Sequence, residues 1–354
     1  MADAGDGPIL DSARLTGFCR AVFERVGMPE AEAALCAESL VEADLRGVAS
    51  HGVVRLPIYA ERLERGANNP RAVPRILRET RGTAVVDGDN GMGQVVGAWA
   101  MEVALRKARE GEPAWVSVRN SNHFGAAAWF AEYATRAEMI GIAITIGGIN
   151  HMVPWGGAEA LLGNNPFAIG MPMRGAPPMM LDMACSVAAR GKIIVAAKEG
   201  TPIPPDWAVD RDGVPTTDAA RALEGFVSPL GGPKGYALTL TMGLLSTMLS
   251  GAAFGREVTH MYEDFARPQN VGHLFAVLPV TAFEDLDTYY ARMETAAAEL
   301  RGARKAPGVA RIHLPGEREA LLRQARLGEG VPVAAAVMEE LVALGLRLGV
   351  PPLK

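Results

Sequence analysis

The spacing of apolar residues predicts helices in the N-terminal part of the chain. Apolar side chains recur three and four positions apart over residues 12–26 and 30–46, which is the period of an amphipathic helix, and Pro29 opens the second segment. A third helix is expected to begin near Val54, because Pro57 is tolerated in the first turn of a helix but not in its interior.

Beyond residue 75 the pattern changes to short runs rich in β-branched and aromatic residues, which predict strands. The runs cover residues 83–87, 114–118, 140–146, 167–171, 179–182 and 272–278, and a further strand is expected to end within residues 309–317. Helical spacing returns at Trp129, Phe130 and Tyr133, over residues 285–301, and after Pro332. Strands that alternate with helices indicate an α/β protein.

Residues 235–255 carry no charge over a length that could span a bilayer. The segment contains several glycines, serines and threonines, and no companion span or aromatic belt accompanies it. We therefore expect a buried helix of an α/β core and no association with a membrane. Its small residues would let another backbone approach closely, including one across a subunit interface.

The composition of the 354 residues is that of an ordinary globular protein, with 49% hydrophobic and 21% charged residues. A net charge of −5 without a basic run gives no reason to expect nucleic acid as a partner. Cys19, Cys36 and Cys185 are too few and too scattered for a disulfide framework or a zinc site. The first residues lack the basic and apolar regions of a secretion signal, so a cytoplasmic enzyme is expected.

The junction between the strand at 114–118 and the following helix contains His123 among small polar residues and a glycine. Loops at the carboxyl ends of strands are where α/β proteins bind ligands, and imidazole titrates near neutral pH. His123 is therefore a candidate for proton transfer. The alternative is a loop histidine that hydrogen-bonds its own turn, and the junction alone does not decide between the two.

A second cluster precedes and opens the third helix. Arg55 and Tyr59 are four residues apart and share a helix face, with His51 in the turn ahead of them. Together these side chains can donate a proton and bind a carboxylate. The alternative is that Arg55 pairs with a nearby acid while His51 caps the helix.

Two further segments suggest phosphate binding. Asp182 falls at a strand end, and Ser186 is expected to cap a helix that carries Arg190 and Lys192, which would make a phosphate site at its N-terminus. Lys234 lies in a glycine-rich turn, where it is either solvated or meets a phosphate or carboxylate.

A Rossmann domain is not predicted. The glycines after the strand at 83–87 run Gly91-x-Gly93-x-x-x-Gly97, one residue too long for the dinucleotide fingerprint. The next strand ends at Arg119-Asn120, where no acidic residue is available to hold a ribose.

Seven motifs together resemble those of a known family, in that family's order. They are Ser50-His-Gly-Val-Val-Arg-Leu-Pro-Ile-Tyr59, Asn120-Ser-Asn-His-Phe-Gly125, Leu181-Asp-Met-Ala184, Val187-Ala-Ala-Arg-Gly-Lys192, Gly231-Gly-Pro-Lys-Gly-Tyr236, Asn270-Val-Gly-His273 and Leu314-Pro-Gly-Glu317. The chain thereby resembles, over nearly its whole length, the type-2 malate/L-lactate dehydrogenase family. That family includes ureidoglycolate, sulfolactate and diketogulonate enzymes and reductases of cyclic imino acids.

The resemblance implies a homodimeric NAD(P)-dependent oxidoreductase with a non-Rossmann α/β fold like that of sulfolactate dehydrogenase. Residues 1–78 and 285–354 would form a mostly helical domain, and residues 79–284 a central cofactor-binding domain. It also implies site roles: His123 or His51 as proton carrier, and Ser50, Arg55 and Tyr59 as substrate ligands. The implied cofactor contacts are Asp182, Met183, Ala184, Ser186, Lys192, Lys234, Gly235, Pro315, Gly316 and Glu317, with no metal.

The expected reaction is reversible hydride transfer between NAD(P)H and a small 2-oxo or 2-hydroxy acid. The alkoxide left by hydride addition needs a proton from histidine, and the adjacent carboxylate calls for the planar fork of Arg55. Three alternatives are kept: a reductase of cyclic imino acids, a metal-dependent hydrolase using His51, His123, His151 and Asp182, and a catalytically inactive binding homologue. The inactive homologue is kept as an alternative because residues 146–151 lie where family members often have an Asn-Ser pair. The substrate, and NADH against NADPH, stay open at this point.

Overall fold

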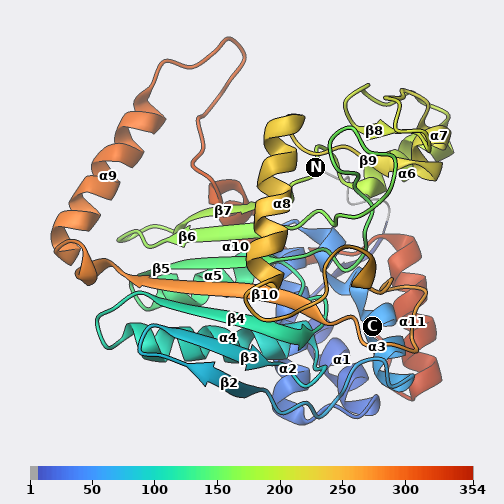
Figure 1. Cartoon of the computed structure of the whole chain (residues 1–354), viewed down its shortest axis with the longest axis horizontal. Coiled ribbons are helices and arrows are strands. Elements are labelled where there is room, and N and C mark those ends of the chain that lie inside the picture. Colours follow the sequence, from blue (N-terminus) through green and yellow to red (C-terminus); the bar gives the residue numbers. More distant parts are fainter. Residues whose placement is uncertain (1–6, 354) are drawn as a thin grey trace.

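A seven-stranded mixed sheet forms the centre of the protein, as described for residues 7–353 by a computed structural model (Figure 1). Only β3 and β4 are parallel, and every other neighbouring pair is antiparallel. The strands, in sheet order, are β2 (Arg75–Glu79), β3 (Thr83–Asp87), β4 (Ala114–Ser121), β10 (Val271–Pro279), β5 (Met139–Thr145), β6 (Phe167–Met171) and β7 (Met179–Met183). The strands expected from the sequence between residues 83 and 278 are confirmed.

Helices cover both faces of this sheet. α4 (Gly93–Ala108) and α5 (Ala127–Arg136) pack on one face through alanines, valines and Phe130, whereas α8 (Pro233–Thr247) lies on the other. Strand β10 is buried along almost its whole length between them because it occupies the middle of the sheet.

The expectation of a buried helix over residues 235–255 is only half right. α8 ends at Thr247, and its fully buried residues are small ones, among them Gly235, Thr239 and Gly243. Leu238 and Met242 also pack against the sheet, whereas Leu245 is 37% exposed, and Met248 and Leu249 just after the helix are 56% and 58% exposed. None of the helices in residues 7–353 has the length and apolarity needed to cross a membrane.

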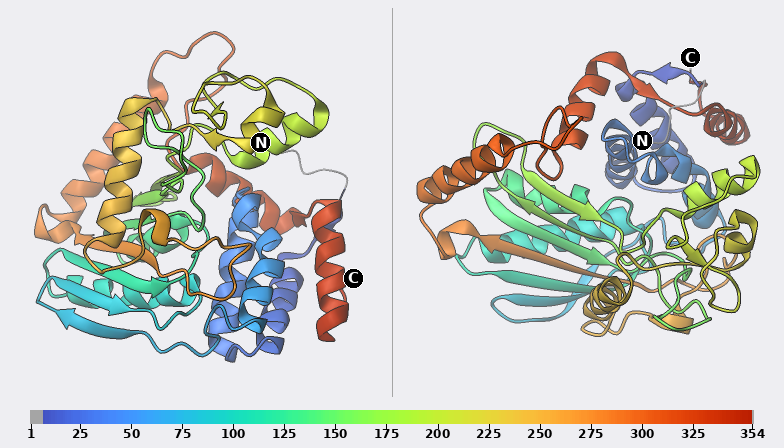
Figure 2. Two further views of the ribbon diagram at one scale, coloured as in Figure 1. Left: turned by 45° about the vertical axis from the view of Figure 1, so that its right-hand side comes forward. Right: turned by 90° about the horizontal axis from the view of Figure 1, so that it is seen from above.

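The two ends of the chain meet in a helical layer beside the sheet (Figure 2). A short pairing of β1 (Ile9–Leu10) with β11 (Val331–Pro332) joins them, and their apolar residues share one core. The layer contains α1 (Ser12–Arg25), α2 (Glu30–Leu45), α3 (Leu56–Glu64), α10 (Glu317–Glu329) and α11 (Ala335–Leu348). α9 (Leu286–Gly302) lies apart from this layer, and Tyr290 donates a hydrogen bond from it to Glu138 beside the sheet.

A small separate cluster contains α6 (Arg190–Glu199), α7 (Ala219–Glu224) and the strands β8 (Ala208–Val209) and β9 (Phe226–Val227). Here the prediction that Ser186 caps a helix is wrong. α6 begins at Arg190 after Ala189, and Ser186 instead forms a bridge with Pro229. The strand expected within residues 309–317 is also absent, because Gly308, Pro315 and Gly316 favour an irregular loop there.

Candidate active site

The segment before α3 is shaped by a buried carboxylate. Its two short 3₁₀ turns are η1 (Ala49–His51) and η2 (Val53–Arg55), and Oδ2 of Asp44 on α2 accepts the Val53 N–H at 2.8 Å. A Cβ on Gly52 would lie 2.0–2.3 Å from the Asp44 carboxyl group, so only glycine fits between the turns. Burial raises the pKa of Asp44 to about 7. This contact fixes the turns that carry Ser50, His51 and Arg55.

The loop between β4 and α5 is equally well held, and it carries His123. The buried Asn122 amide donates to the backbone oxygens of Asn90 and Gly91. The start of α4 presses on the same loop, since a Cβ on Gly93 would lie 2.2 Å from the Asn122 carbonyl oxygen. His123 is therefore presented from a rigid support.

The two segments bring the predicted catalytic and substrate residues together. The Tyr59 hydroxyl lies 2.6 Å from Nδ1 of His123, and the rings of His51 and His123 are 5.6 Å apart, centroid to centroid. Arg55 donates from Nε to the Ser50 carbonyl oxygen at 2.6 Å, and Ser50 Oγ lies 3.0 Å from His51 Nδ1. His51 does not cap α3, whose N-cap is Arg55 without a side-chain hydrogen bond.

The electrostatics of this cluster favour an anionic ligand. Burial lowers the pKa of His123 well below its ordinary value, and the neighbouring His51, Arg55 and His273 lower it further. Burial and Arg55 also lower the pKa of His51 to about 4. No carboxylate in residues 7–353 forms an ion pair with Arg55, so its charge is free to meet a ligand.

Two adjoining cavities meet at this cluster. One, of about 750 Å³, is lined by His51, Arg55 and His123, and the other, of about 710 Å³, by residues of β7 and the loop before α10. Both volumes are in the range of small-molecule sites. The residues that line both cavities are Ser50, His51, Gly125, Asn164, Pro166, Ser186 and Ala189.

The second cavity, here called the β7 cleft, gathers most of the predicted cofactor contacts. Its walls include Asp182, Met183, Ala184, Ser186, Lys192, Pro315 and Gly316. Lys234 and Gly235, in the first turn of α8, line neither cavity. The Glu317 carboxylate does not line the cleft. It accepts a hydrogen bond from the Leu314 N–H and forms ion pairs with Arg301 and Arg311.

The donor set of the β7 cleft fits a nicotinamide dinucleotide. Lys192 forms no ion pair within the described chain and offers a cation for phosphate. One oxygen of Asp182 accepts the Ala128 N–H at 3.1 Å, which leaves the other for a ribose hydroxyl. The wall also includes the flat ring of Trp129.

Sequence reasoning missed several polar residues around the two histidines. Asn150 lines the larger cavity, and Gln94 lies buried behind it. Arg190, expected at a phosphate site, lines this larger cavity and not the β7 cleft. A polar residue in the first turn of the apolar segment 93–108 was the available signal for Gln94. Among residues 7–353 no group of three or more His, Cys, Asp or Glu side chains is arranged to hold a metal ion.

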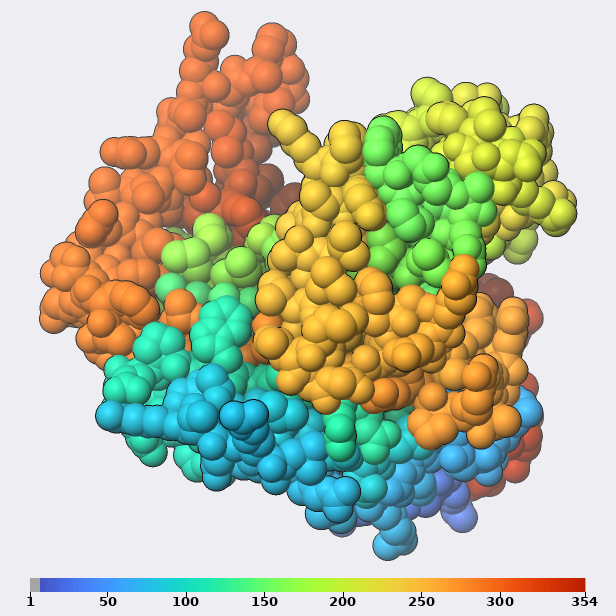
Figure 3. Space-filling view, in the orientation of Figure 1, coloured from blue at the N-terminus to red at the C-terminus, as the bar shows by residue number. Residues whose placement is uncertain are grey.

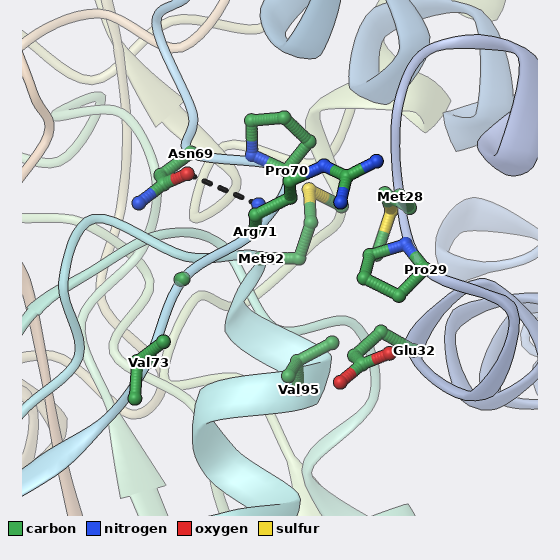
Figure 4. Close-up of a pocket in the computed structure, with 10 residues that line it drawn as sticks. Met28, Pro29, Glu32, Asn69, Pro70, Arg71, Val73, Met92 and Val95 are labelled. Carbon is green, nitrogen blue, oxygen red and sulfur yellow. Dashed lines mark hydrogen bonds between the residues drawn. The ribbon is translucent and has the colours of Figure 1, made fainter.

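A separate small cavity of about 170 Å³ lies between the start of α2 and the start of α4 (Figure 4). Its labelled walls are mostly apolar, with Glu32 and Arg71 as the charged members. None of the histidines lines it, so it is distinct from the candidate site.

Comparison with known proteins identifies the family of the chain. The family model described as Malate/L-lactate dehydrogenase matches residues 10–342. The chain belongs to the malate/L-lactate dehydrogenase family. The family resemblance of the seven motifs and the expected α/β fold are thereby confirmed.

Several curated members of the malate/L-lactate dehydrogenase family align with most of the chain. Malate dehydrogenase of Pyrococcus horikoshii is 39% identical over 345 residues, covering 95% of this chain and 94% of the relative. Ureidoglycolate dehydrogenase (NAD(+)) of Escherichia coli is 35% identical, with 90% of each chain covered. (2R)-3-sulfolactate dehydrogenase (NADP(+)) of Chromohalobacter salexigens is 36% identical, with 91% and 94% covered.

Solved structures extend the agreement to the fold. Sulfolactate dehydrogenase of Methanocaldococcus jannaschii superposes with a TM-score of 0.91 at 37% identity, covering 97% of this chain and 98% of that one. Δ1-piperideine-2-carboxylate reductase of Pseudomonas syringae superposes with a TM-score of 0.83 at 30% identity, covering 95% and 99%. The chain therefore has the non-Rossmann fold that the sequence resemblance implied.

Proposed function

We propose that this protein is an NAD(P)-dependent oxidoreductase that interconverts a small 2-hydroxy acid and the corresponding 2-oxo acid. The observation that carries the proposal is His123, which lies in one cavity wall with His51 and the unpaired Arg55 and is held from behind by the buried Tyr59 hydroxyl. That cavity adjoins the β7 cleft, whose donors suit a dinucleotide. Relatives named as malate and ureidoglycolate dehydrogenases support the same reaction class.

Arg55 is the proposed ligand of the substrate carboxylate. Its Nε is committed to the Ser50 carbonyl oxygen, which orients the guanidinium and leaves the two terminal nitrogens for a carboxylate. Ser50 and Tyr59 complete the proposed grip, since Ser50 adjoins Arg55 and Tyr59 holds His123. A bound carboxylate would also neutralise a charge that now lowers the pKa of both histidines.

His123 is the proposed proton carrier and His51 its assistant. In the free site both imidazoles are neutral at pH 7, because burial lowers their pKa values. A neutral imidazole suits removal of the alcohol proton during oxidation of a hydroxy acid. In the reverse direction, neutralisation of Arg55 by substrate raises the histidine pKa, and the imidazolium then protonates the alkoxide. When bound, the nicotinamide supplies or accepts the hydride.

A cyclic imino acid is a second candidate substrate. The superposition on Δ1-piperideine-2-carboxylate reductase supports it, as does the shared chemistry of a carboxylate next to a reducible double bond. Arg55 would serve both substrates in the same way. The relatives' names include both NAD(+) and NADP(+), so both cofactors belong in the test.

We also propose that the protein is a homodimer. The apolar side chains on the outer face of α8 and just after it, with Leu245 37% exposed and Met248 56% exposed, support an interface there, and Figure 3 shows this helix uncovered on the surface. α9 projects from the body in the same view, so it could contact a second copy of the chain. Sedimentation velocity of the protein and of Met248→Glu tests this, and a monomeric parent protein would exclude it.

The three cysteines are buried and unpaired, which supports a reducing compartment such as the cytoplasm.

The division into a terminal helical domain and a central cofactor domain is likewise our proposal. Limited proteolysis with and without NADH tests that division, because protection by NADH is expected to concentrate in residues 79–284.

The decisive test of the reaction is a substrate panel. Purified protein is assayed with 2-oxo acids, among them oxaloacetate, pyruvate and sulfopyruvate, and with cyclic imino acids, using NADH and NADPH in turn. Consumption of reduced nicotinamide with a 2-oxo acid is expected. Tight cofactor binding without turnover of any member would identify a catalytically inactive homologue instead.

A further inference from the structure

Gln94, in the first turn of α4, is a fully buried polar residue with no hydrogen-bond partner for either end of its amide. Burying an unpaired amide costs about 1–3 kcal/mol, so its presence calls for an explanation. The side chain lies beside the catalytic pair. A Cβ on Gly125 would be 3.6 Å from Gln94 Nε2, and the Gly125 N–H itself points at His123 Nδ1 from 3.4 Å, the nitrogen that the Tyr59 hydroxyl also meets. Burial raises the pKa of the Tyr59 phenol, and Arg55 and the Gln94 amide act in the opposite direction.

The donors around His123 fix which ring nitrogen carries the proton in the free enzyme. The Gly125 N–H, which can only donate, points at Nδ1 from 3.4 Å, and the Tyr59 hydroxyl lies 2.6 Å from the same nitrogen. Nδ1 is therefore the acceptor, Tyr59 donates to it, and the proton resides on Nε2. The Cδ2 edge of the ring faces Gly148, which lines the larger cavity, so Nε2 is on the substrate side.

With its hydrogen committed to His123, the Tyr59 oxygen keeps only its capacity to accept, which the free Gln94 Nε2 donor can fill. A protonated His123 reverses this chain, because Nδ1 then donates to the Tyr59 oxygen and the hydroxyl hydrogen needs an acceptor. The Gln94 amide carries both a donor and an acceptor, and both are free. A turn of the amide plane therefore supplies the partner required in either protonation state.

We propose that Gln94 is a positioning residue for proton transfer, whose amide holds the Tyr59 hydroxyl on His123 in both protonation states of the imidazole. The proposal rests on the proposed function for its catalytic meaning, but not for the hydrogen-bond polarity. No substrate contact is assigned to Gln94, since it lies behind the cavity wall.

Two substitutions at Gln94 separate positioning from packing. Gln94→Met keeps the shape without a donor or acceptor, and it should disfavour the imidazolium, which would leave the Tyr59 hydroxyl unpaired. Gln94→Glu supplies only acceptors when ionised, and it should favour the imidazolium. A hydrogen bond to a charged group is worth about 1.5–3 kcal/mol, so shifts of about one pH unit in opposite directions are expected.

The first measurement is the pH dependence of kcat for reduction of the best 2-oxo acid in the panel. The pKa seen in kcat should fall in Gln94→Met and rise in Gln94→Glu, and kcat of Gln94→Met should drop about 10- to 100-fold, as for other second-layer hydrogen-bond partners. The charged and titratable groups facing His123 are His51, Arg55, Tyr59 and His273, and all of them are unchanged in both variants. Shifts in the same direction, or none, would overturn the proposal.

The second measurement does not require turnover. The protein has six histidines, so ¹⁵N-histidine labelling with His123→Gln as the assignment control resolves the imidazole of His123. The parent should show protonated Nε2 and bare Nδ1, and Gln94→Glu should show protonation of Nδ1 at higher pH than the parent. Bare Nε2 in the parent would refute the assignment, even if the enzyme reduces no tested acid and the proposed function fails.

Ser117→Ala is the matched control, because Ser117 Oγ is also buried and unpaired but lies in β4 outside both cavities. It should leave the kcat profile and the His123 signals unchanged. If Gln94→Met does not fold, Gln94→Glu and the spectrum of the parent protein still decide the matter.

Discussion

The rings of His51 and His123 are stacked with an interplanar angle of 19° and a centroid separation of 5.6 Å. Two imidazoles so close do not both hold a proton readily, and each lowers the chance that the other is charged. Under the proposed reaction, one of them is therefore the principal proton carrier. Of the two histidines, only His123 is in hydrogen-bond contact with Tyr59, which supports His123 in that role.

Replacement of His123 should thus be more damaging than replacement of His51. His123→Gln keeps a hydrogen-bond donor but cannot titrate, so kcat should fall by about two to four orders of magnitude while NADH binding is retained. His51→Gln should act more through KM. Steady-state kinetics with a fluorescence titration of NADH checks this, and an active His123→Gln beside a nearly dead His51→Gln would make His51 the acid.

The pH dependence of hydroxy-acid oxidation follows from the lowered histidine pKa values. The catalytic base must be neutral, and in the free enzyme the pKa of His51 is about 4 and that of His123 lies well below 6.5. As the pH falls, kcat/KM should therefore hold through pH 6.5 and decline only at lower pH, because kcat/KM reports groups of the free enzyme. An acid limb centred at pH 6.5 or above would show that the free site is more solvated than described here.

Arg55→Lys should raise KM for the acid substrate although it conserves the charge. Lysine cannot hold the Ser50 carbonyl oxygen and a carboxylate fork at once, and the lost charge-assisted hydrogen bond is worth about 1.5–3 kcal/mol, or roughly 10- to 100-fold. Arg109→Lys, on the exposed end of α4, is the control. Parental KM in Arg55→Lys would remove the bidentate contact from the proposal.

Lys192→Ala should weaken cofactor binding more than it slows saturated turnover. Lys192 lines the β7 cleft, and loss of a partly exposed charge pair of about 1 kcal/mol gives an increase in Kd of about fivefold. Lys198→Ala, at the exposed end of the same helix, should leave Kd unchanged. Lys234→Ala, measured alongside by isothermal titration with NADH and NADPH, checks the sequence-based assignment of that lysine, and a larger effect there would move the phosphates toward α8.

Asp44→Asn should change the pH dependence of stability. Burial raises the folded-state pKa of Asp44 to about 7 from an ordinary value of 3.8, so the folded state binds the proton more tightly than the unfolded state. Its contribution to stability is present at low pH and is lost as the pH rises toward 7, on a scale of about 1.4 kcal/mol per pKa unit. The variant should lose less Tm between pH 5 and pH 8 than the parent, whereas the exposed Asp206→Asn should match the parent.

Local sequence patterns predicted the elements well where one physical signal dominated. The helix after Pro29 shows helical spacing, the strand that includes Phe275 is a continuous apolar run, and both form as expected. Ser186 failed as a helix cap because the bridge to Pro229 holds that residue in an extended loop. α8 was misjudged because lack of charge does not say which face of a helix packs, and one face of α8, with Leu245, stays exposed.

The site was predictable only as far as residue chemistry and family resemblance allowed. His51, Arg55 and His123 were identified, but their convergence depends on Gly52 resting against Asp44, a contact between residues that no periodicity relates. Gln94 could not be assigned, because its importance comes from its place behind Tyr59. The pKa values, which decide the protonation states, depend on burial and on the neighbouring charges that the fold brings together.

Tyr59 is packed in the apolar core of the terminal helices, whereas Phe124, next to His123, belongs to the core on the sheet. The contact between Tyr59 and His123 therefore joins two separately packed cores. It forms only while these two cores keep their relative position. Catalytic rate is consequently a finer gauge of that position than circular dichroism or a melting curve. A substitution that shifts one core relative to the other would abolish activity while both cores stayed folded.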